Sequence, residues 1–297
     1  MKGLHILLTY RCDLECDHCF VWGSPRQTGV MSLESVRETL SQAKELRTLD
    51  WIYFEGGEPF LYYSALVGGV REASRLGFKV GVLSNCYWAT TVEDALEWLR
   101  PFAGVVQDFS ISSDLYHSSD KLSQQARNAS AAAENLRIPV GVISIAQPEE
   151  TSESAMGQLP RGKSAVMFRG RAAEKLTRRA PSVPWNQFTK CPHEKLQDLD
   201  RLHVDPFGNL HICQGIMIGN LHRTRLREVC RSYNPSRHPI VGPLLYGGPT
   251  ELAIRHDLPH RQTYADACHL CYEARKALRT RFTETLGPEQ MYGVLEK

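Results

Sequence analysis

The sequence lacks a long apolar run, a strong excess of charge and an export signal. No stretch of its 297 residues approaches the apolar length that crosses a membrane. A formal net charge of +2 gives no reason to expect a nucleic acid or an anionic membrane as partner. The apolar core of residues 1–8 is too short for a signal peptide, and no cleavage motif follows it. We therefore expect a cytoplasmic globular protein with one large domain or two smaller ones.

Cysteine, in contrast, is abundant. Without an export signal, nine cysteines indicate a reducing compartment, where thiols bind metals or take part in catalysis. The odd number also argues against a fully paired set of disulfides.

Three cysteines lie close together near the start of the chain. Cys12, Cys16 and Cys19 have the spacing C-x3-C-x2-C, directly after a short apolar run. Three thiolates from one loop can hold one metal centre, but a structural zinc ion or a cubane iron–sulfur cluster normally takes four protein ligands. With three, one metal position is left for water or a substrate, which indicates chemistry. On this stretch alone, a fragmentary zinc knuckle or a chance group of core cysteines is the alternative.

The first part of the chain alternates between predicted strands and helices. Strands are predicted at residues 4–9, 51–54, 79–83, 105–111, 140–145 and 165–168. Helices are predicted at residues 32–49, 63–76, 91–99 and 118–136. A full helix is not expected between the last two strands, where Pro and Gly are frequent. Such alternation predicts parallel strands in an α/β barrel or in an open doubly wound sheet.

Unusual polar groups follow several of these strands. In parallel α/β folds the active site forms at the carboxyl ends of the strands, so these groups are expected to share one rim. They are Gly56-Gly57-Glu58-Pro59, Ser84-Asn85, Ser112-Ser113-Asp114 and Arg169.

Composition changes after about residue 173. A β-hairpin is predicted at residues 202–213, with Pro and Gly in its turn. Residues 230–248 are rich in Pro, Gly and Tyr and are predicted to form a loop, and a final helix is predicted at 268–282.

The C-x3-C-x2-C motif after a first strand, with Gly-Gly-Glu-Pro after the second, resembles the radical S-adenosylmethionine (SAM) superfamily. The resemblance covers roughly residues 1–175 and implies a partial (β/α)6 barrel. It implies that Cys12, Cys16 and Cys19 hold a [4Fe–4S] cluster whose fourth iron binds SAM. One electron then cleaves SAM to methionine and a 5′-deoxyadenosyl radical, which abstracts a hydrogen atom from the substrate.

The same resemblance implies roles for the polar rim. Gly56 and Gly57 would let the backbone approach the methionine portion of SAM, and Glu58 would balance its ammonium group. Phe20 would pack beside the adenine or the cluster, with simple core packing as the alternative. Candidate contacts to the ribose and carboxylate of SAM, with capping or turn formation as the alternative role, are Ser84, Asn85, Ser112 and Asp114. Pro59 and Arg169 are the other cofactor-binding candidates.

A second cysteine set resembles the auxiliary-cluster region called the twitch domain, a shorter form of the SPASM domain. The set comprises Cys191, Cys213, Cys268 and Cys271. Four thiolates would close one auxiliary [4Fe–4S] cluster, which suits outer-sphere electron transfer. A structural zinc site is the alternative. The expected domains are 1–175 for the radical SAM core and 176–285 for the auxiliary region, with a tail at 286–297.

Four further residues with reactive side chains lie outside these two sets of three and four cysteines. Cys86 and His117 lie near the rim and are candidates for catalysis. Cys86 is a donor of a hydrogen atom or proton or a simply buried thiol, and His117 contacts substrate or caps the following helix. Cys230 could be a spare ligand or simply a buried thiol. His18 is expected to be a solvated residue of the cysteine loop.

The leading hypothesis is an enzyme that oxidises its substrate or forms a C–X bond, with the auxiliary cluster accepting an electron. A redox-neutral epimerase, mutase or decarboxylase is the enzymatic alternative, and a metal-binding scaffold or redox sensor is the non-enzymatic one. The expected partners are an electron donor such as flavodoxin or ferredoxin, and a small-molecule or peptide substrate. Because the first strand begins near residue 4, we expect no N-terminal peptide-recognition domain, which favours a small molecule or a peptide presented by another protein.

Overall fold

A curved sheet of nine strands organises the computed structural model, which describes residues 2–120, 122–150 and 162–294. The sheet has the order β10-β9-β8-β1-β2-β3-β4-β5-β6, and β7 pairs with β11 apart from it. The strands are β1 Gly3–Thr9, β2 Trp51–Gly56, β3 Lys79–Ser84, β4 Asp108–Ser112, β5 Val140–Ile145, β6 Gly162–Ser164, β7 Val183–Pro184, β8 Arg201–Val204, β9 Asn209–Cys213, β10 Ile216–Asn220 and β11 Thr263–Tyr264. The helices are α1 Leu33–Lys44, α2 Tyr63–Arg75, α3 Val92–Leu99, α4 Gln124–Asn135, α5 Arg171–Lys175, α6 Leu226–Ser232, α7 Val241–Arg255 and α8 Ala267–Leu278.

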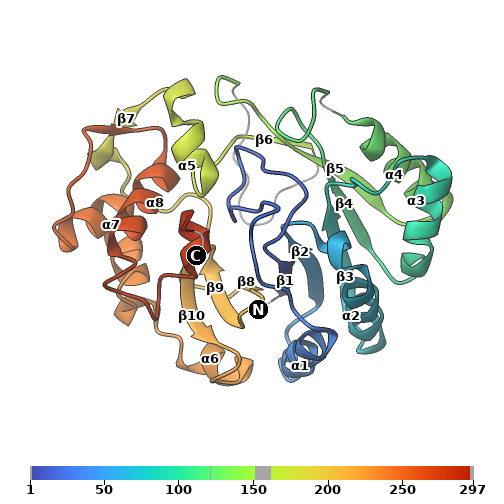
Figure 1. Ribbon diagram of the computed structural model, residues 1–297. Coiled ribbons are helices and arrows are strands. Elements are labelled where there is room, and N and C mark those ends of the chain that lie inside the picture. The colour runs from blue at the N-terminus through green and yellow to red at the C-terminus, as the bar shows by residue number, and fades with distance from the viewer. Residues whose placement is uncertain (1, 121, 151–161, 295–297) are drawn as a thin grey trace.

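Strands β1 to β6 pair in sequence order and in parallel, and α1 to α4 follow the outer side of the sheet (Figure 1). The predicted α/β fold with a partial barrel is therefore confirmed. The starts of α1 and α3 could be predicted because capping side chains precede them. Ser32 accepts a hydrogen bond from the backbone of Ser35, and Thr91 accepts one from the backbone of Asp94.

Two predicted elements among these strands and helices have the wrong bounds. Helix α4 begins only after Ser123, whose side chain caps it, so the expected helix at 118–136 is too long. The sixth strand is Gly162–Ser164, not 165–168. The backbone of Phe168 instead donates to Asp266 Oδ2, and that of Arg169 to the carbonyl of Met167, so the ladder does not continue. The expectation for residues 151–161 lies outside the described residues.

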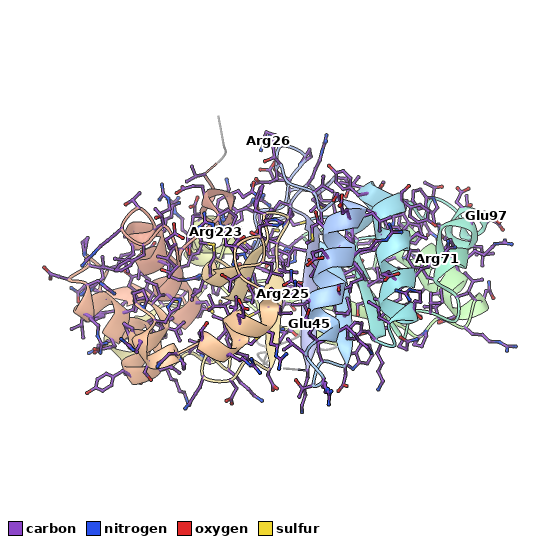
Figure 2. The ribbon with its side chains drawn as sticks, turned by 90° about the horizontal axis from the view of Figure 1, so that it is seen from below. Arg26, Glu45, Arg71, Glu97, Arg223 and Arg225 are labelled. Carbon is purple, nitrogen blue, oxygen red and sulfur yellow. The ribbon has the colours of Figure 1, made fainter. Side chains whose placement is uncertain are left out.

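The hairpin at residues 202–213 is confirmed as β8 and β9, but it does not form a separate sheet. Strand β8 pairs in parallel with β1, with Leu4 opposite Leu202 and His5 opposite His203. The second cysteine region is therefore joined to the barrel by backbone hydrogen bonds. Outside the sheet, Arg225 forms an ion pair with Glu45 between α6 and α1 (Figure 2).

The predicted loop at residues 230–248 is wrong. Helix α7 occupies its second half and is interrupted at Gly247 and Gly248, where the backbone is not helical. Gly248 has φ +65°, and a Cβ atom there would lie 2.3 Å from the backbone nitrogen of Lys190. Gly248 thus allows a close approach to the backbone of Lys190. The Pro and Gly content of residues 230–248 suggested a loop, but these residues interrupt a helix instead.

The strands of the barrel have an apolar outer face, which packs against the helices, and a polar inner face. Leu4 and Ile6 of β1 are fully buried against the helices, while the alternate residue His5 points into the barrel. The same alternation places Tyr53, Glu55, Arg201 and His203 on the inner side. In the part of the chain that the structure describes, no helix has the length and apolarity needed to cross a bilayer.

Candidate active site

The three cysteines of the first motif line one cavity of about 100 Å³ at the carboxyl ends of the strands. We call it the cysteine-loop cavity. Its lining includes most of the predicted rim residues: Cys12, Cys16, Cys19, Phe20, Gly56, Gly57, Ser84, Asn85, Ser112 and His117. The expectation that these groups share one rim is met for this set. Glu58, Pro59, Cys86, Asp114 and Arg169 are not among the lining residues.

The loop presents its sulfur atoms to backbone donors. The amide of Leu14 donates to Cys12 Sγ at 3.5 Å, and that of Gly23 to Cys19 Sγ at 3.2 Å. Burial raises the pKa of the Cys12 and Cys19 thiols, so their thiolate forms need a cation to be stable. Buried Arg171 holds the loop by donating to the carbonyls of Cys16 and Gly23. Thiolates with amide donors and an open side fit a metal cluster.

Gly56 and Gly57 fasten this loop to the end of β2. The amide of Gly57 donates to the carbonyl of Thr9 at 2.7 Å. A Cβ atom on Gly57 would lie 2.1 Å from the carbonyl oxygen of Arg11, and one on Gly56 would lie 2.3 Å from that of Thr9. The glycines are required here for the contact between two backbone segments. Their contact with SAM stays a prediction.

Glu58 is fully buried and joins the ends of two strands. Its carboxylate accepts from the Phe60 amide at 3.0 Å, the Ser84 hydroxyl at 3.0 Å and the Asn85 amide at 2.8 Å. Burial raises the pKa of Glu58 to about 7, although these donors oppose the shift. Pro59 follows as the first residue of a short 3-10 helix. Glu58 thus holds the ends of β2 and β3 together through hydrogen bonds, without lining the cavity itself.

Asp114 and two histidines form a cluster beside Cys16. His117 Nδ1 lies 2.8 Å from Asp114 Oδ1, and His117 Nε2 lies 3.2 Å from the Ser112 hydroxyl. Burial alone would lower the pKa of His117, but Asp114 and the Cys16 sulfur raise it to about 10. His18 was expected to be solvated, and this is wrong: its ring stacks on Tyr116, and burial lowers its pKa to about 4.

The remaining two cysteines lie away from the cysteine-loop cavity wall. Cys86 is fully buried with φ +62°, and its Sγ faces the carbonyl of Ser84 at 3.8 Å. A role as hydrogen donor stays a prediction. Cys230 lies on α6 and does not line the cavity that the second cysteine set surrounds.

The second cysteine set converges on one cavity, although its members come from three separate segments. Cys213 ends β9, and Cys268 and Cys271 lie one helical turn apart on α8. Cys191 completes the wall, and Arg169 and Arg275 also line it. Burial raises the pKa of the Cys191 thiol to about 12 and also raises that of the Cys268 and Cys271 thiols.

Two buried guanidinium groups face these thiols. Arg275 donates to the carbonyls of Cys271 and Gln214, and no carboxylate among the described residues lies within salt-bridge distance of it. A buried cation without a carboxylate requires negative charge nearby. Four thiolates around a metal centre supply that charge, so the site fits either an iron–sulfur cluster or zinc.

Arg169 lies beside the second cysteine set rather than on the wall of the cysteine-loop cavity. Its Nη1 donates to Cys213 Sγ at 3.5 Å and to Glu194 at 3.1 Å. Its guanidinium also lies over the ring of Phe20, 5.1 Å from the centroid. Since Phe20 follows Cys19 directly, this contact spans the space between the two cysteine sites.

Sequence reasoning missed a polar group inside the barrel: His5, Glu55 and His203. The available signal was the strand pattern, in which a histidine or glutamate sits at an inward position between apolar residues. What the sequence did not show was that β8 lies next to β1.

A family model described as the radical SAM superfamily matches residues 6–137, which include the cysteine loop and the Gly-Gly-Glu segment. Residues 6–137 are thus similar to a radical SAM domain. This similarity agrees with the resemblance that the two sequence motifs indicate.

Two curated relatives match parts of the chain. The putative peptide biosynthesis protein YydG of Bacillus subtilis (strain 168) is 30% identical over 128 residues, covering 43% of this chain and 40% of YydG. The tungsten-containing aldehyde ferredoxin oxidoreductase cofactor-modifying protein of Pyrococcus furiosus is 34% identical over 86 residues, covering 29% of this chain and 24% of that protein. The matches thus span less than half the length of either relative.

A solved structure extends the fold comparison beyond the matched domain. SuiB of Streptococcus suis, bound to S-adenosylmethionine, is 13% identical with a TM-score of 0.52, over 86% of this chain and 75% of SuiB. At this identity the similarity concerns the fold alone.

Proposed function

We propose that the chain is a radical SAM enzyme that oxidises its substrate with the help of a second cluster. Cys12, Cys16 and Cys19 hold the SAM-binding [4Fe–4S] cluster. The auxiliary cluster is held by Cys191, Cys213, Cys268 and Cys271. The observation that carries this proposal is the contact between Phe20 and Arg169, which links a site with three thiols to a site with four.

With its cluster and SAM bound, the radical SAM site would supply a 5′-deoxyadenosyl radical to remove a hydrogen atom from the substrate. The chain's residues bind and orient the reactants. Asn85, Ser112 and His117 offer polar atoms to SAM from the wall of the cysteine-loop cavity. Phe20 offers an apolar face to the adenine, and Arg171 fixes the loop. A flavodoxin or ferredoxin delivers the electron for SAM cleavage.

The four-thiol site is suited to accepting the electron that the substrate radical releases. Four protein ligands leave no position for a substrate, so the transfer is outer-sphere. Arg169 neutralises charge at Cys213 and packs on Phe20, and the region at 176–285 acts as an electron-transfer unit attached to the core at 1–175.

A peptide is the proposed substrate class. Support comes from the name of the Bacillus subtilis relative, a putative peptide biosynthesis protein. A small molecule remains the alternative, and both would enter the polar interior of the barrel beside Glu55, which borders the cysteine-loop cavity.

The second cluster can be tested without knowing the substrate. A Cys12/Cys16/Cys19→Ala triple variant, reconstituted with iron and sulfide under anaerobic conditions, should retain one [4Fe–4S] cluster by Mössbauer and EPR spectroscopy. The matched control replaces the four downstream cysteines and should retain only the SAM-binding cluster. Zinc without iron in the triple variant would refute the auxiliary cluster and identify a structural zinc site.

The oxidative outcome is tested by stoichiometry once a peptide substrate is turned over. Oxidation consumes one SAM per product and gives a product that is two electrons more oxidised than the substrate. The electron that the substrate radical releases balances the electron that cleaves SAM. Regeneration of SAM, or a product at the same oxidation level as the substrate, would instead establish a redox-neutral epimerase, mutase or decarboxylase.

A further inference from the structure

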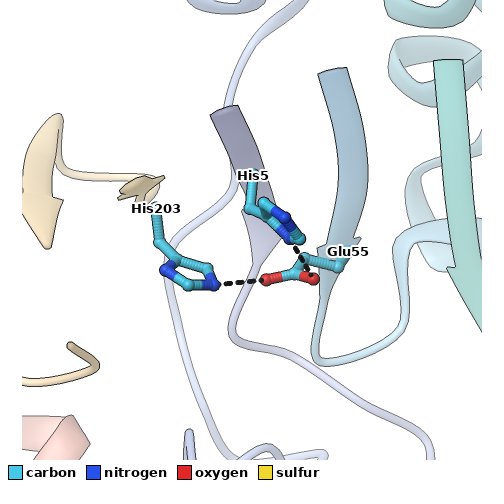
Figure 3. Close-up of side chains that lie close together, drawn as sticks. All are labelled: His5, Glu55 and His203. Atoms are coloured by element: carbon cyan, nitrogen blue, oxygen red, sulfur yellow. Dashed lines mark hydrogen bonds and ion pairs between the residues drawn. The ribbon is translucent and has the colours of Figure 1, made fainter. Parts of the chain in front are cut away.

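Inside the barrel, three side chains with metal-binding atoms meet on neighbouring strands. His203 of β8 lies directly opposite His5 of β1, and His5 pairs in register with Tyr53 of β2. Glu55 lies two residues beyond Tyr53 and therefore on the same inward face. Figure 3 shows the two imidazole rings approaching the Glu55 carboxylate from different sides. One ligand atom from each residue lies within 4.8 Å of the other two.

The contacts within this trio are close but incomplete. His5 Nδ1 lies 2.9 Å from Glu55 Oε2, while His203 Nε2 lies 3.4 Å from Glu55 Oε1. The Nε2 atoms of His203 and Gln214 are also 3.2 Å apart, so His203 Nε2 faces two groups and can satisfy only one of them. Among the described residues, His203 Nδ1 and Gln214 Oε1 are buried without a hydrogen-bond partner. Unpaired buried atoms cost free energy. Gln214 Oε1 belongs to the amide that faces His203 Nε2, so a ligand bound beside these side chains can satisfy it, whereas His203 Nδ1 is not the ring nitrogen that faces Glu55.

Charge at the site leaves Glu55 available for a cation. The cationic groups that face the same cavity are Arg169 and Arg201, and both form ion pairs with Glu194, at 3.1 and 2.7 Å. The ion pairs of Glu55 among the described residues are those with His5 and His203. Because Glu194 partly neutralises the guanidinium groups, a cation bound by Glu55 is not opposed by two free positive charges.

We propose that His5, Glu55 and His203 form a binding site for a divalent metal ion of the zinc class. Two histidines and one glutamate are a donor set that catalytic zinc sites use, with a fourth position left open. The ion would reach the trio through a pocket of about 430 Å³ at the amino ends of the strands, which His5 and Tyr53 also line. An ion-bound water could donate to Gln214 Oε1.

This placement gives the ion a defined part in substrate binding. Glu55 borders both the barrel interior and the cysteine-loop cavity. The open position would take an oxygen or nitrogen atom of the substrate and hold it beside the SAM site. Metal binding at this site does not depend on SAM cleavage. A failure of the metal proposal would therefore not imply a failure of the proposed function, and the reverse also holds.

Zinc binding tests the proposal on the anaerobically reconstituted full-length protein. After equilibrium dialysis against zinc chloride, the wild type should retain one zinc per chain with unchanged iron content. Glu55→Gln and His203→Gln should each weaken zinc binding at least about 10-fold, since even partners of metal ligands have effects of that size. His222→Gln, at an exposed histidine, is the matched control and should bind as the wild type does.

X-ray absorption at the zinc edge on the wild-type protein separates the trio from the cysteines even if a variant fails to fold. Nitrogen and oxygen ligands at about 2.0–2.2 Å are expected. Sulfur ligands at about 2.3 Å would overturn the proposal, because they would place the zinc on the cysteines. The proposal would also be overturned if the wild type retained no zinc, or if Glu55→Gln and His203→Gln retained as much zinc as the wild type.

Discussion

Replacing Arg169 by glutamine should lower the reduction potential of the second cluster. The guanidinium of Arg169 is buried and donates to Cys213 Sγ at 3.5 Å. The sulfur of a cluster ligand carries more negative charge when the cluster is reduced, so this cation stabilises the reduced state more than the oxidised one. Glutamine removes the charge, and the reduced state loses that stabilisation.

The size of the shift follows from the strength of the contact. A hydrogen bond to a charged group contributes about 1.5–3 kcal/mol. If about 1.4 kcal/mol of this distinguishes the two redox states, the midpoint potential falls by about 60 mV for a one-electron couple. EPR-monitored redox titration measures it, in a background where Cys12, Cys16 and Cys19 are alanine so that the SAM-binding cluster gives no signal.

Arg201 provides the matched control for this measurement. It shares the carboxylate of Glu194 with Arg169 but makes no hydrogen bond to a cysteine among the described residues. Arg201→Gln should therefore leave the potential near that of the parent, and Arg169→Lys should restore part of it. An unchanged potential in Arg169→Gln, or an equal fall in Arg201→Gln, would refute the reasoning.

Three further predictions concern the rim. Gly57→Ala places a Cβ atom 2.1 Å from the Arg11 carbonyl oxygen. It should lower the free energy of unfolding by about 1–3 kcal/mol, measured by denaturation, and should reduce the iron content of the reconstituted protein. Wild-type values of both quantities would contradict the prediction. Because burial raises the pKa of Glu58 to about 7, the folded protein keeps a proton that the unfolded chain releases above about pH 4.5, so stability should fall as the pH rises towards 7. The loss for the wild type is up to about 3 kcal/mol, and Glu58→Gln should lack it. Urea titrations at several pH values measure the free energy of unfolding of both proteins. The same dependence on pH in the two proteins would disprove the prediction. Cys86→Ala should still form 5′-deoxyadenosine by chromatography, because its sulfur lies outside the cysteine-loop cavity wall; loss of that product would assign Cys86 to SAM cleavage.

Local signals predicted the barrel and its rim well. Ser32 and Thr91 cap helices with their own side chains, and β1, β2 and β3 are short apolar segments that pair with their sequence neighbours. The cysteine loop and Gly56-Gly57 could be placed together because parallel neighbours end at the same edge. In each case the information lies within a few residues or between adjacent strands.

Features that depend on distant segments were not predictable in this way. Residues 165–168 do not form a strand because the Phe168 amide bonds Asp266, almost a hundred positions away. Arg169 was assigned to SAM because it follows a predicted strand, yet it contacts Cys213. The trio of His5, Glu55 and His203 forms only because β8 pairs with β1.

Formation of 5′-deoxyadenosine tests most directly the claim that the three-cysteine site is open for SAM and the four-cysteine site is closed. The anaerobically reconstituted wild type, given dithionite and SAM, should form it. Cys268→Ala should retain cleavage while losing substrate oxidation, and Cys16→Ala should form none. Absence of 5′-deoxyadenosine in the wild type, or equal amounts in Cys16→Ala, would contradict the account.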